Sequence, residues 1–332
     1  MENNESWDLL LSKFRRLGGV ADNVCQKEGK YGRGIFSINP NLKSRIFTPS
    51  NLFIKKSDID LKNNQLRIKK DKGYKQEIME FFNFYQDNFS WGAGGRETTE
   101  FFEKGLSLFN PNLKKLINDY ALIDLNKRHE GNWNNNLKEQ FLKARSFYFF
   151  NDQYIAPIWE LVNHKVKSLP FIINKQGIST PNYPSLNGEI RHSYCKVSPI
   201  NCFFCYGFYS EETVVFSFPW SINIESIGIE ISCKGMAIDD DSMKIERIGN
   251  KIIIEGLPIG DKNHPKLPHH YFEEITSKIG LQIPKDFFLK ILNKNISIRK
   301  KIINQSNCEV NNISKILIKL MLYEISLISS HS

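Results

Sequence analysis

Four short segments of this chain contain residue types that could contact a ligand or a reacting group. In chain order they are Tyr31-Gly32-Arg33-Gly34-Ile35-Phe36, Lys143-Ala144-Arg145-Ser146-Phe147, Pro157-Ile158-Trp159-Glu160-Leu161-Val162-Asn163-His164, and Gly188-Glu189-Ile190 leading into Ser193-Tyr194 and Asn201-Cys202-Phe203-Phe204-Cys205-Tyr206-Gly207-Phe208. Taken alone, each has an ordinary structural interpretation. A Gly-x-Gly occurs wherever a turn needs a positive φ, His164 on an apolar segment is typical of a core histidine, and Tyr206-Gly207-Phe208 is typical of a buried strand end. The order of the segments is therefore more informative than any one of them.

The spacing of these residues argues against two familiar kinds of site. Gly32-Arg33-Gly34 precedes a predicted strand rather than a helix and lacks a third glycine, which argues against a Rossmann dinucleotide fingerprint. Cys202 and Cys205 have the spacing of metal ligands, but a structural zinc site needs about four ligands and no second pair follows. The acidic run Asp239-Asp240-Asp241 is interpreted as a solvated turn. We therefore expect no metal site.

Composition and charge set broader limits. The chain has 332 residues, of which 41% are apolar and 12% aromatic, so it is expected to fold around a sizeable core. Its net charge of +9 supports an acidic partner only weakly. No stretch approaches ~18 uncharged apolar residues, which predicts no membrane span. Acidic residues precede the first apolar run, which is the wrong order for a secretory signal, so we expect a cytoplasmic protein.

The hydrophobic pattern divides the chain into strand-rich and helix-rich parts. A helix over residues 6–17 and a strand over 34–38 come first. Apolar residues at steps of three and four positions then predict a helical block at about 75–145. Short apolar runs in 151–220, broken by Asn, Pro and Gly, favour strands and loops. The remaining predicted elements are strands at 227–232, 243–248 and 251–256 and helices at 271–279, 284–303 and 313–328.

In their order, the four segments resemble the SET-domain lysine methyltransferases. The most similar subgroup is the one typified by the Rubisco large-subunit lysine methyltransferase, whose SET domain is split by a helical insertion. The resemblance covers roughly residues 6–210. Asn163-His164-Lys165 stands where the family has Asn-His-Ser, and Ser193-Tyr194-Cys195 stands where it has Ser-Tyr-Gly. These two departures affect substrate-side details more than the fold.

The resemblance implies an α+β fold. A SET domain of small, mostly antiparallel sheets with a pseudoknot is expected over residues 1–220, with its helical insertion at about 75–145. A mainly helical C-terminal region that resembles a substrate-binding domain is expected over 221–332.

The resemblance also implies S-adenosylmethionine as the cofactor and a lysine-bearing protein as the substrate. By family position, the cofactor would be contacted by Gly32, Arg33, Gly34, Arg145, Asn163 and His164. The two glycines would let the backbone approach the methionine end, and the guanidinium would match the cofactor's carboxylate. Tyr206 would be the catalytic phenol, and Tyr194 and Phe208 would line the channel for the lysine.

Three other functions are compatible with parts of the sequence. A catalytically inactive SET-like module could bind lysine-rich protein segments, and a related enzyme could methylate histidine instead of lysine. Nucleic-acid binding would have to use basic helices such as the one carrying Arg299-Lys300-Lys301, which we interpret as a solvated face. Nucleic acid is not the expected partner.

Overall fold

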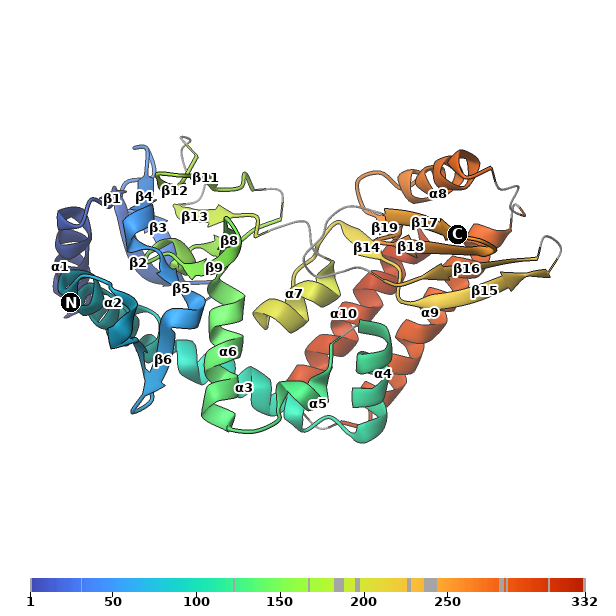
Figure 1. The fold of residues 1–332 in the computed structure, drawn as a ribbon, viewed down its shortest axis with the longest axis horizontal. Coiled ribbons are helices and arrows are strands. Elements are labelled where there is room, and N and C mark those ends of the chain that lie inside the picture. Colours follow the sequence, from blue (N-terminus) through green and yellow to red (C-terminus); the bar gives the residue numbers. More distant parts are fainter. Residues whose placement is uncertain are drawn as a thin grey trace. The chain divides into compact units, whose positions relative to one another are not determined.

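The structure is a computed structural model that describes all of the chain except residues 1, 31, 122, 167, 182–187, 195–197, 226–227, 236–243, 281–283, 285, 310 and 331–332. The chain forms two compact units (Figure 1). The first contains Met1–Glu100 and Gly131–Cys195, and the second contains Phe101–Glu130 and Lys196–Ser332. The expected domain limit at residue 220 lies inside the second unit and stays a prediction. The predicted acidic turn at Asp239–Asp241 lies outside the described residues.

The described residues of the first unit form several small sheets. Their strand orders are β1-β4-β12-β11, β10-β13-β3-β2, β5-β9-β8 and β6-β7. All of these pairs are antiparallel except β10 with β13. The strands are β1 Val20–Asp22, β2 Val24–Gly29, β3 Gly32–Ser37, β4 Arg45–Pro49, β5 Ile54–Lys55, β6 Ile59–Lys62, β7 Gln65–Ile68, β8 Phe147–Phe149, β9 Asp152–Ile155, β10 Asn163–His164, β11 Ile172–Asn174, β12 Gly177–Ser179 and β13 Glu189–His192. The predicted small, mostly antiparallel sheets are therefore confirmed.

Helices cover the apolar side of these sheets. In α1, Trp7 and Phe14 lie on one face at helical spacing and pack against α2, where they meet Phe89 and Phe81 at ring-centroid distances of 5.5 and 6.0 Å. Both α1 residues are at most 4% exposed, so this face belongs to the core of the unit. The helices are α1 Glu2–Arg16, α2 Gln76–Phe89 and α6 Trp133–Arg145, with short 3-10 turns η1 Ser50–Leu52, η2 Lys56–Asp58, η3 Lys70–Lys72, η4 Trp91–Ala93 and η5 Trp159–Leu161.

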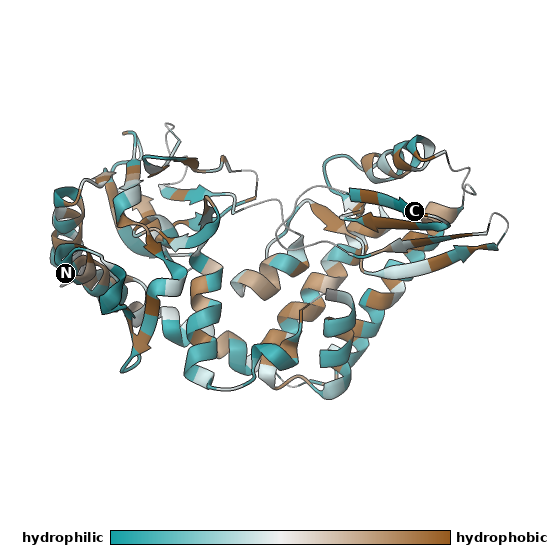
Figure 2. Cartoon of the chain, in the orientation of Figure 1, coloured by the Kyte–Doolittle hydropathy of each residue, from teal (hydrophilic) through white to brown (hydrophobic). Residues whose placement is uncertain are grey.

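The second unit combines a four-stranded sheet with long helices. The sheet has the order β15-β16-β18-β17, and β14 pairs separately with β19. A hairpin through Gly249 and Asn250 joins β17 to β18. Apolar positions recur along the helices (brown in Figure 2). No helix in the described part of the chain is long and apolar enough to cross a membrane. The strands are β14 Val214–Phe216, β15 Trp220–Ile224, β16 Ile229–Cys233, β17 Lys244–Ile248, β18 Lys251–Glu255 and β19 Pro258–Asp261, and the helices are α4 Pro111–Ala121, α5 Leu125–Arg128, α7 Pro199–Tyr206, α8 Leu267–Lys278, α9 Phe287–Ser306 and α10 Asn312–Ser329. Helix α3 (Gly95–Ser107) begins in the first unit and ends in the second.

Helix α7 differs from the predicted strands and loops. Ser198 caps its start by accepting a hydrogen bond from the Asn201 N–H, and Pro199 occupies the first helical turn. Gly207 ends the helix with a φ of +78°. A Ser-Pro start and a glycine stop are ordinary helix signals. The short apolar run between them gave no helical periodicity, and burial on several sides explains why.

The basic run on α9 also departs from its prediction. Arg299 is fully buried, whereas its neighbours Lys300 and Lys301 are exposed. Arg299 lies on the same face of α9 as Ile291, Asn295 and Ile302, which are all buried. The interpretation of all three basic residues as one solvated face is therefore wrong for Arg299.

Gly105→Val is expected to destabilise the second unit. A Cβ at Gly105 would lie only 2.8 Å from Cβ of Ile313, and closer still to Cγ1 of that side chain. Ile313 is 3% exposed and starts α10, so it has little room to move. We expect a loss of about 2 kcal/mol in the free energy of unfolding, measured by urea denaturation. Ser107→Ala in the same helix should change it by under about 0.5 kcal/mol. Equal stability of Gly105→Val and wild type would contradict the close contact between helices.

Candidate functional site

The Gly-x-Gly and Asn-His segments meet in one sheet. Strand β13 lies between them, pairing antiparallel with β3 and parallel with β10. The Asn163 side-chain amide donates hydrogen bonds to Glu189 Oε1 at 2.9 Å and to the Arg33 carbonyl at 3.3 Å. A Cβ at Gly34 would lie 2.5 Å from Asn163 Nδ2 and 2.9 Å from Glu189 Oε1. Gly34 is therefore needed because the Asn163 amide occupies the space beside it.

The start of β3 has its own requirement for glycine. Gly32 has a φ of +86°, which L side chains rarely adopt. No described atom lies within 4 Å of the place a Cβ would take, so the requirement comes from the backbone. Arg33 is exposed and donates from Nη1 to the Ala93 carbonyl at 3.1 Å. The backbone of this strand is thus open on the side of Gly32 and closely packed at Gly34.

Arg145 ends helix α6 in the first unit. Its guanidinium carbon lies 4.0 Å from the centroid of the Phe141 ring, one helical turn earlier. Its Nε lies 3.5 Å from Glu160 Oε2, and the arginine side chain is 29% exposed while the glutamate side chain is fully buried. The structure therefore pairs Arg145 with a buried carboxylate that sequence reasoning did not select.

Two glutamates, Glu160 and Glu189, were missed as site residues. Both lie inside the segments singled out by sequence, but neither glutamate was predicted to contact the cofactor. Glu189 accepts from Asn163 and forms an ion pair with Arg191 at 2.9 Å. Burial raises the pKa of Glu160, and the charge of Arg145 opposes this shift. Glu160 follows a tryptophan and Glu189 follows a glycine, and no local sequence pattern marks either as functional.

Tyr194 lies beside the Asn-His segment. Its hydroxyl donates to the Val162 carbonyl at 3.0 Å, and its backbone N–H donates to His164 Nδ1 at 3.1 Å. Its ring centroid is 4.8 Å from that of His192 and 5.1 Å from that of His164. Burial lowers the pKa of His192 to about 3, so this imidazole is neutral at physiological pH. The first unit therefore surrounds the end of β10 with aromatic rings.

Tyr206 and Phe208 belong to the second unit. Tyr206 is the last residue of α7, and its ring stacks on Phe208 with centroids 5.9 Å apart. Gly207 between them packs against the Phe102 ring. The structure thus brings Gly34, Asn163 and Tyr194 into the first unit and places Tyr206 with Phe208 in the second.

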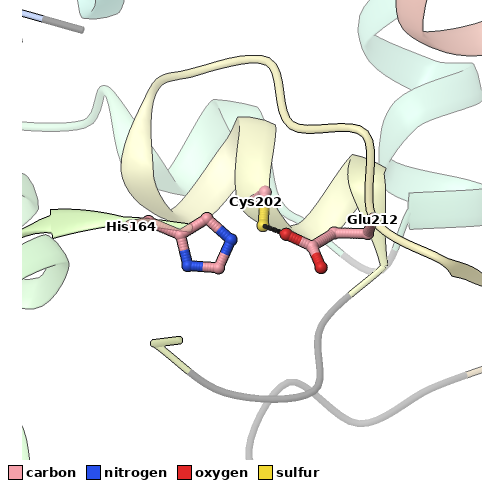
Figure 3. A group of neighbouring side chains, drawn as sticks. All are labelled: His164, Cys202 and Glu212. Atoms are coloured by element: carbon pink, nitrogen blue, oxygen red, sulfur yellow. Dashed lines mark hydrogen bonds between the residues drawn. The ribbon is translucent and has the colours of Figure 1, made fainter. Parts of the chain in front are cut away.

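The buried face of α7 carries a polar contact. The Cys202 thiol donates to Glu212 Oε1 at 3.5 Å (Figure 3), and the Ser210 hydroxyl donates to the same oxygen at 2.7 Å. The Glu212 carbonyl also accepts from the Tyr323 hydroxyl at 2.9 Å. These contacts fix the segment that follows Phe208.

Comparison with known proteins gives similarity at the level of structure. No family model matches the chain, and no curated protein matches its sequence. The chain is similar to the SET domain of LSMT bound to lysine and AdoHcy, with a TM-score of 0.44 and 12% identity over 98% of this chain and 89% of that chain. It is also similar to Rubisco LSMT bound to sinefungin and monomethyllysine, with a TM-score of 0.48 and 12% identity over 98% of this chain and 90% of that chain.

Proposed function

We propose that this protein transfers a methyl group from S-adenosylmethionine to the ε-amine of a lysine in a protein substrate. The observation that carries the proposal is the packing of Gly34 against the Asn163 amide within one sheet. The order of the four sequence segments supports the same function. Binding of AdoHcy and lysine by LSMT, named above, is consistent with it.

Residues of the first unit fit the cofactor chemically. The open space beside Gly32 lets an amino-acid end approach the backbone of β3, and a larger residue at Gly34 would displace Asn163. The Arg145 guanidinium carries the charge and the fork that a carboxylate requires. His164 accepts a hydrogen bond at Nδ1 from the Tyr194 N–H, so a neutral ring would carry its proton on Nε2. When bound, the cofactor supplies a methyl group on a positive sulfonium.

The acceptor must reach the site as a neutral amine. A lysine of pKa ≈ 10.4 is protonated at pH 7, and supplying the free amine costs about 4–5 kcal/mol. Aromatic walls lower this cost because they disfavour the ammonium form next to a second positive charge. In this proposal Tyr206 orients the amine through its hydroxyl, while Phe208 and Tyr194 provide apolar walls. Positioning then supplies much of the remaining rate enhancement.

Calorimetry with S-adenosylhomocysteine tests the cofactor site directly. Wild type is expected to bind, and Gly34→Ala is expected to bind at least about tenfold more weakly, equivalent to about 1.4 kcal/mol, because its Cβ displaces the Asn163 amide. The melting temperature of Gly34→Ala serves as the control for global unfolding. Absence of binding by folded wild type would refute the proposed function.

Transfer of a labelled methyl group to proteins of a cell extract tests the reaction itself. Mass spectrometry of the labelled peptides should place the methyl group on lysine. A labelled methyl group on histidine would instead identify the protein as a histidine methyltransferase. Cofactor binding without any transfer would instead favour the inactive lysine-binding module.

A further inference from the structure

Glu160 is a buried carboxylate within the candidate cofactor unit. It lies in η5, three residues before Asn163, and its side chain is fully buried. Gln86 Nε2 and the Ser90 hydroxyl each donate to its Oε1 at 2.9 Å. Its Oε2 accepts no hydrogen bond from the described residues and faces Arg145 Nε at 3.5 Å. One oxygen is thus anchored to the fold and the other faces the arginine, and the Tyr85 hydroxyl also lies beside the carboxylate.

These contacts fix Arg145 on two sides. The Phe141 ring covers one face of the guanidinium at 4.0 Å, and the Glu160 carboxylate lies at Nε. Among the described residues, Arg145 has no other ion pair or hydrogen bond, so its two terminal nitrogens keep their donors for a ligand. With 29% of the side chain exposed, a ligand can reach them. An arginine held this way presents a two-pronged donor in a fixed direction.

Stability alone does not account for this arrangement. Burying a carboxylate removes it from water, and burial raises the pKa of Glu160 although Arg145 opposes the shift. A carboxyl group with a raised folded-state pKa lowers stability as the pH rises from its unfolded pKa through its folded pKa. The charged form of Glu160 therefore costs stability relative to a neutral group of the same shape.

We propose that Glu160 is a positioning residue that holds the Arg145 guanidinium for the carboxylate of the cofactor's amino-acid end. The inference rests on the proposed function and deepens it. It makes the site selective for ligands that carry this carboxylate, because the directed nitrogens of Arg145 have no role toward the adenosine end.

A pair of ligands separates positioning from a general structural role. S-adenosylhomocysteine carries the amino-acid carboxylate, whereas 5′-methylthioadenosine lacks the whole amino-acid group. Glu160→Gln keeps an oxygen for Gln86 and Ser90 but removes the charge at Arg145. We expect Glu160→Gln to weaken the binding of S-adenosylhomocysteine about tenfold, which is the usual effect of losing a hydrogen bond to a charged group. The binding of 5′-methylthioadenosine should weaken less than twofold. Calorimetry on the full chain at pH 8 measures both.

Two further variants complete the experiment. Arg145→Ala should reproduce the selective loss, whereas Glu139→Gln, which removes an exposed carboxylate on the same helix as Arg145, should bind both ligands like wild type. The melting temperature of Glu160→Gln at pH 8 should be no lower than that of wild type. Unchanged binding, or equal weakening of both ligands, would overturn the positioning role. Failure of wild type to bind either ligand would instead overturn the proposed function on which the role depends.

Discussion

Tyr206→Phe is expected to lower the rate of methyl transfer by about 10²-fold, because the Tyr206 oxygen can no longer accept a hydrogen bond from the amine N–H; the loss of one positioned hydrogen bond in an active site has an effect of this size. The substitution removes only the hydroxyl and keeps the ring that stacks on Phe208 at 5.9 Å. Without the hydroxyl, the acceptor amine loses the group that directs its lone pair at the methyl carbon. Single-turnover transfer of a labelled methyl group measures this step, and S-adenosylhomocysteine binding should stay within about twofold.

Two other tyrosines make the test specific. Tyr209→Phe is the matched control, because its hydroxyl contacts only Glu211, at 3.4 Å, among the described residues and its pKa is raised to about 12 by burial. This variant should transfer at the wild-type rate. Tyr194→Phe removes a hydroxyl that donates to the Val162 carbonyl, and its effect should be smaller than that of Tyr206→Phe. If Tyr194→Phe lowered the transfer rate more than Tyr206→Phe, Tyr194 rather than Tyr206 would be the catalytic residue.

Arg299→Met is expected to lower the free energy of unfolding by about 3–5 kcal/mol, the usual cost of breaking one side of a buried ion pair. Arg299 and Glu324 are both fully buried, and Arg299 Nε donates to Glu324 Oε2 at 2.8 Å. Arg299 also donates to Asn295 Oδ1 and to the Phe216 carbonyl, and Glu324 accepts from the Ile200 N–H. The pair therefore joins α9 and α10 to β14 and to the start of α7.

The pH dependence of this loss has a defined sign. Burial raises the pKa of Glu324, and Arg299 opposes the shift in wild type. Without the arginine, the folded-state pKa rises further above the unfolded value, so stability falls as the pH rises between the two values. Urea unfolding should show a larger loss for Arg299→Met at pH 8 than at pH 5.

Two variants check that the charge pair is the cause. Lys300→Met, at the exposed neighbouring position, should change stability by under about 0.5 kcal/mol. Arg299→Met combined with Glu324→Met should recover much of the loss, because no buried charge is then left unpaired. If Arg299→Met were as stable as wild type at both pH 5 and pH 8, this would contradict the buried ion pair.

The sequence alone determined the elements whose signal is local. The strand over 34–38 and the helices over 6–17 and 313–328 were predicted from the hydrophobic pattern, and the structure has β3, α1 and α10 there. These predictions succeed because one buried face imposes its period on the residues of a single segment. The division into strand-rich and helix-rich parts followed from the same pattern, whereas the small, mostly antiparallel sheets were predicted from the family resemblance.

Only the tertiary structure decided which polar residues meet. Glu189 contacts Asn163 because β13 lies between β3 and β10, and Glu160 faces Arg145 because η5 packs beside the end of α6. Arg299 looked like part of a solvated basic face until α10 placed Glu324 against it. Hydrophobic burial follows a period along the chain, whereas a charge pair depends on a partner many residues away. The sequence therefore indicated where apolar faces lie, and the fold selected the partners of the buried charges.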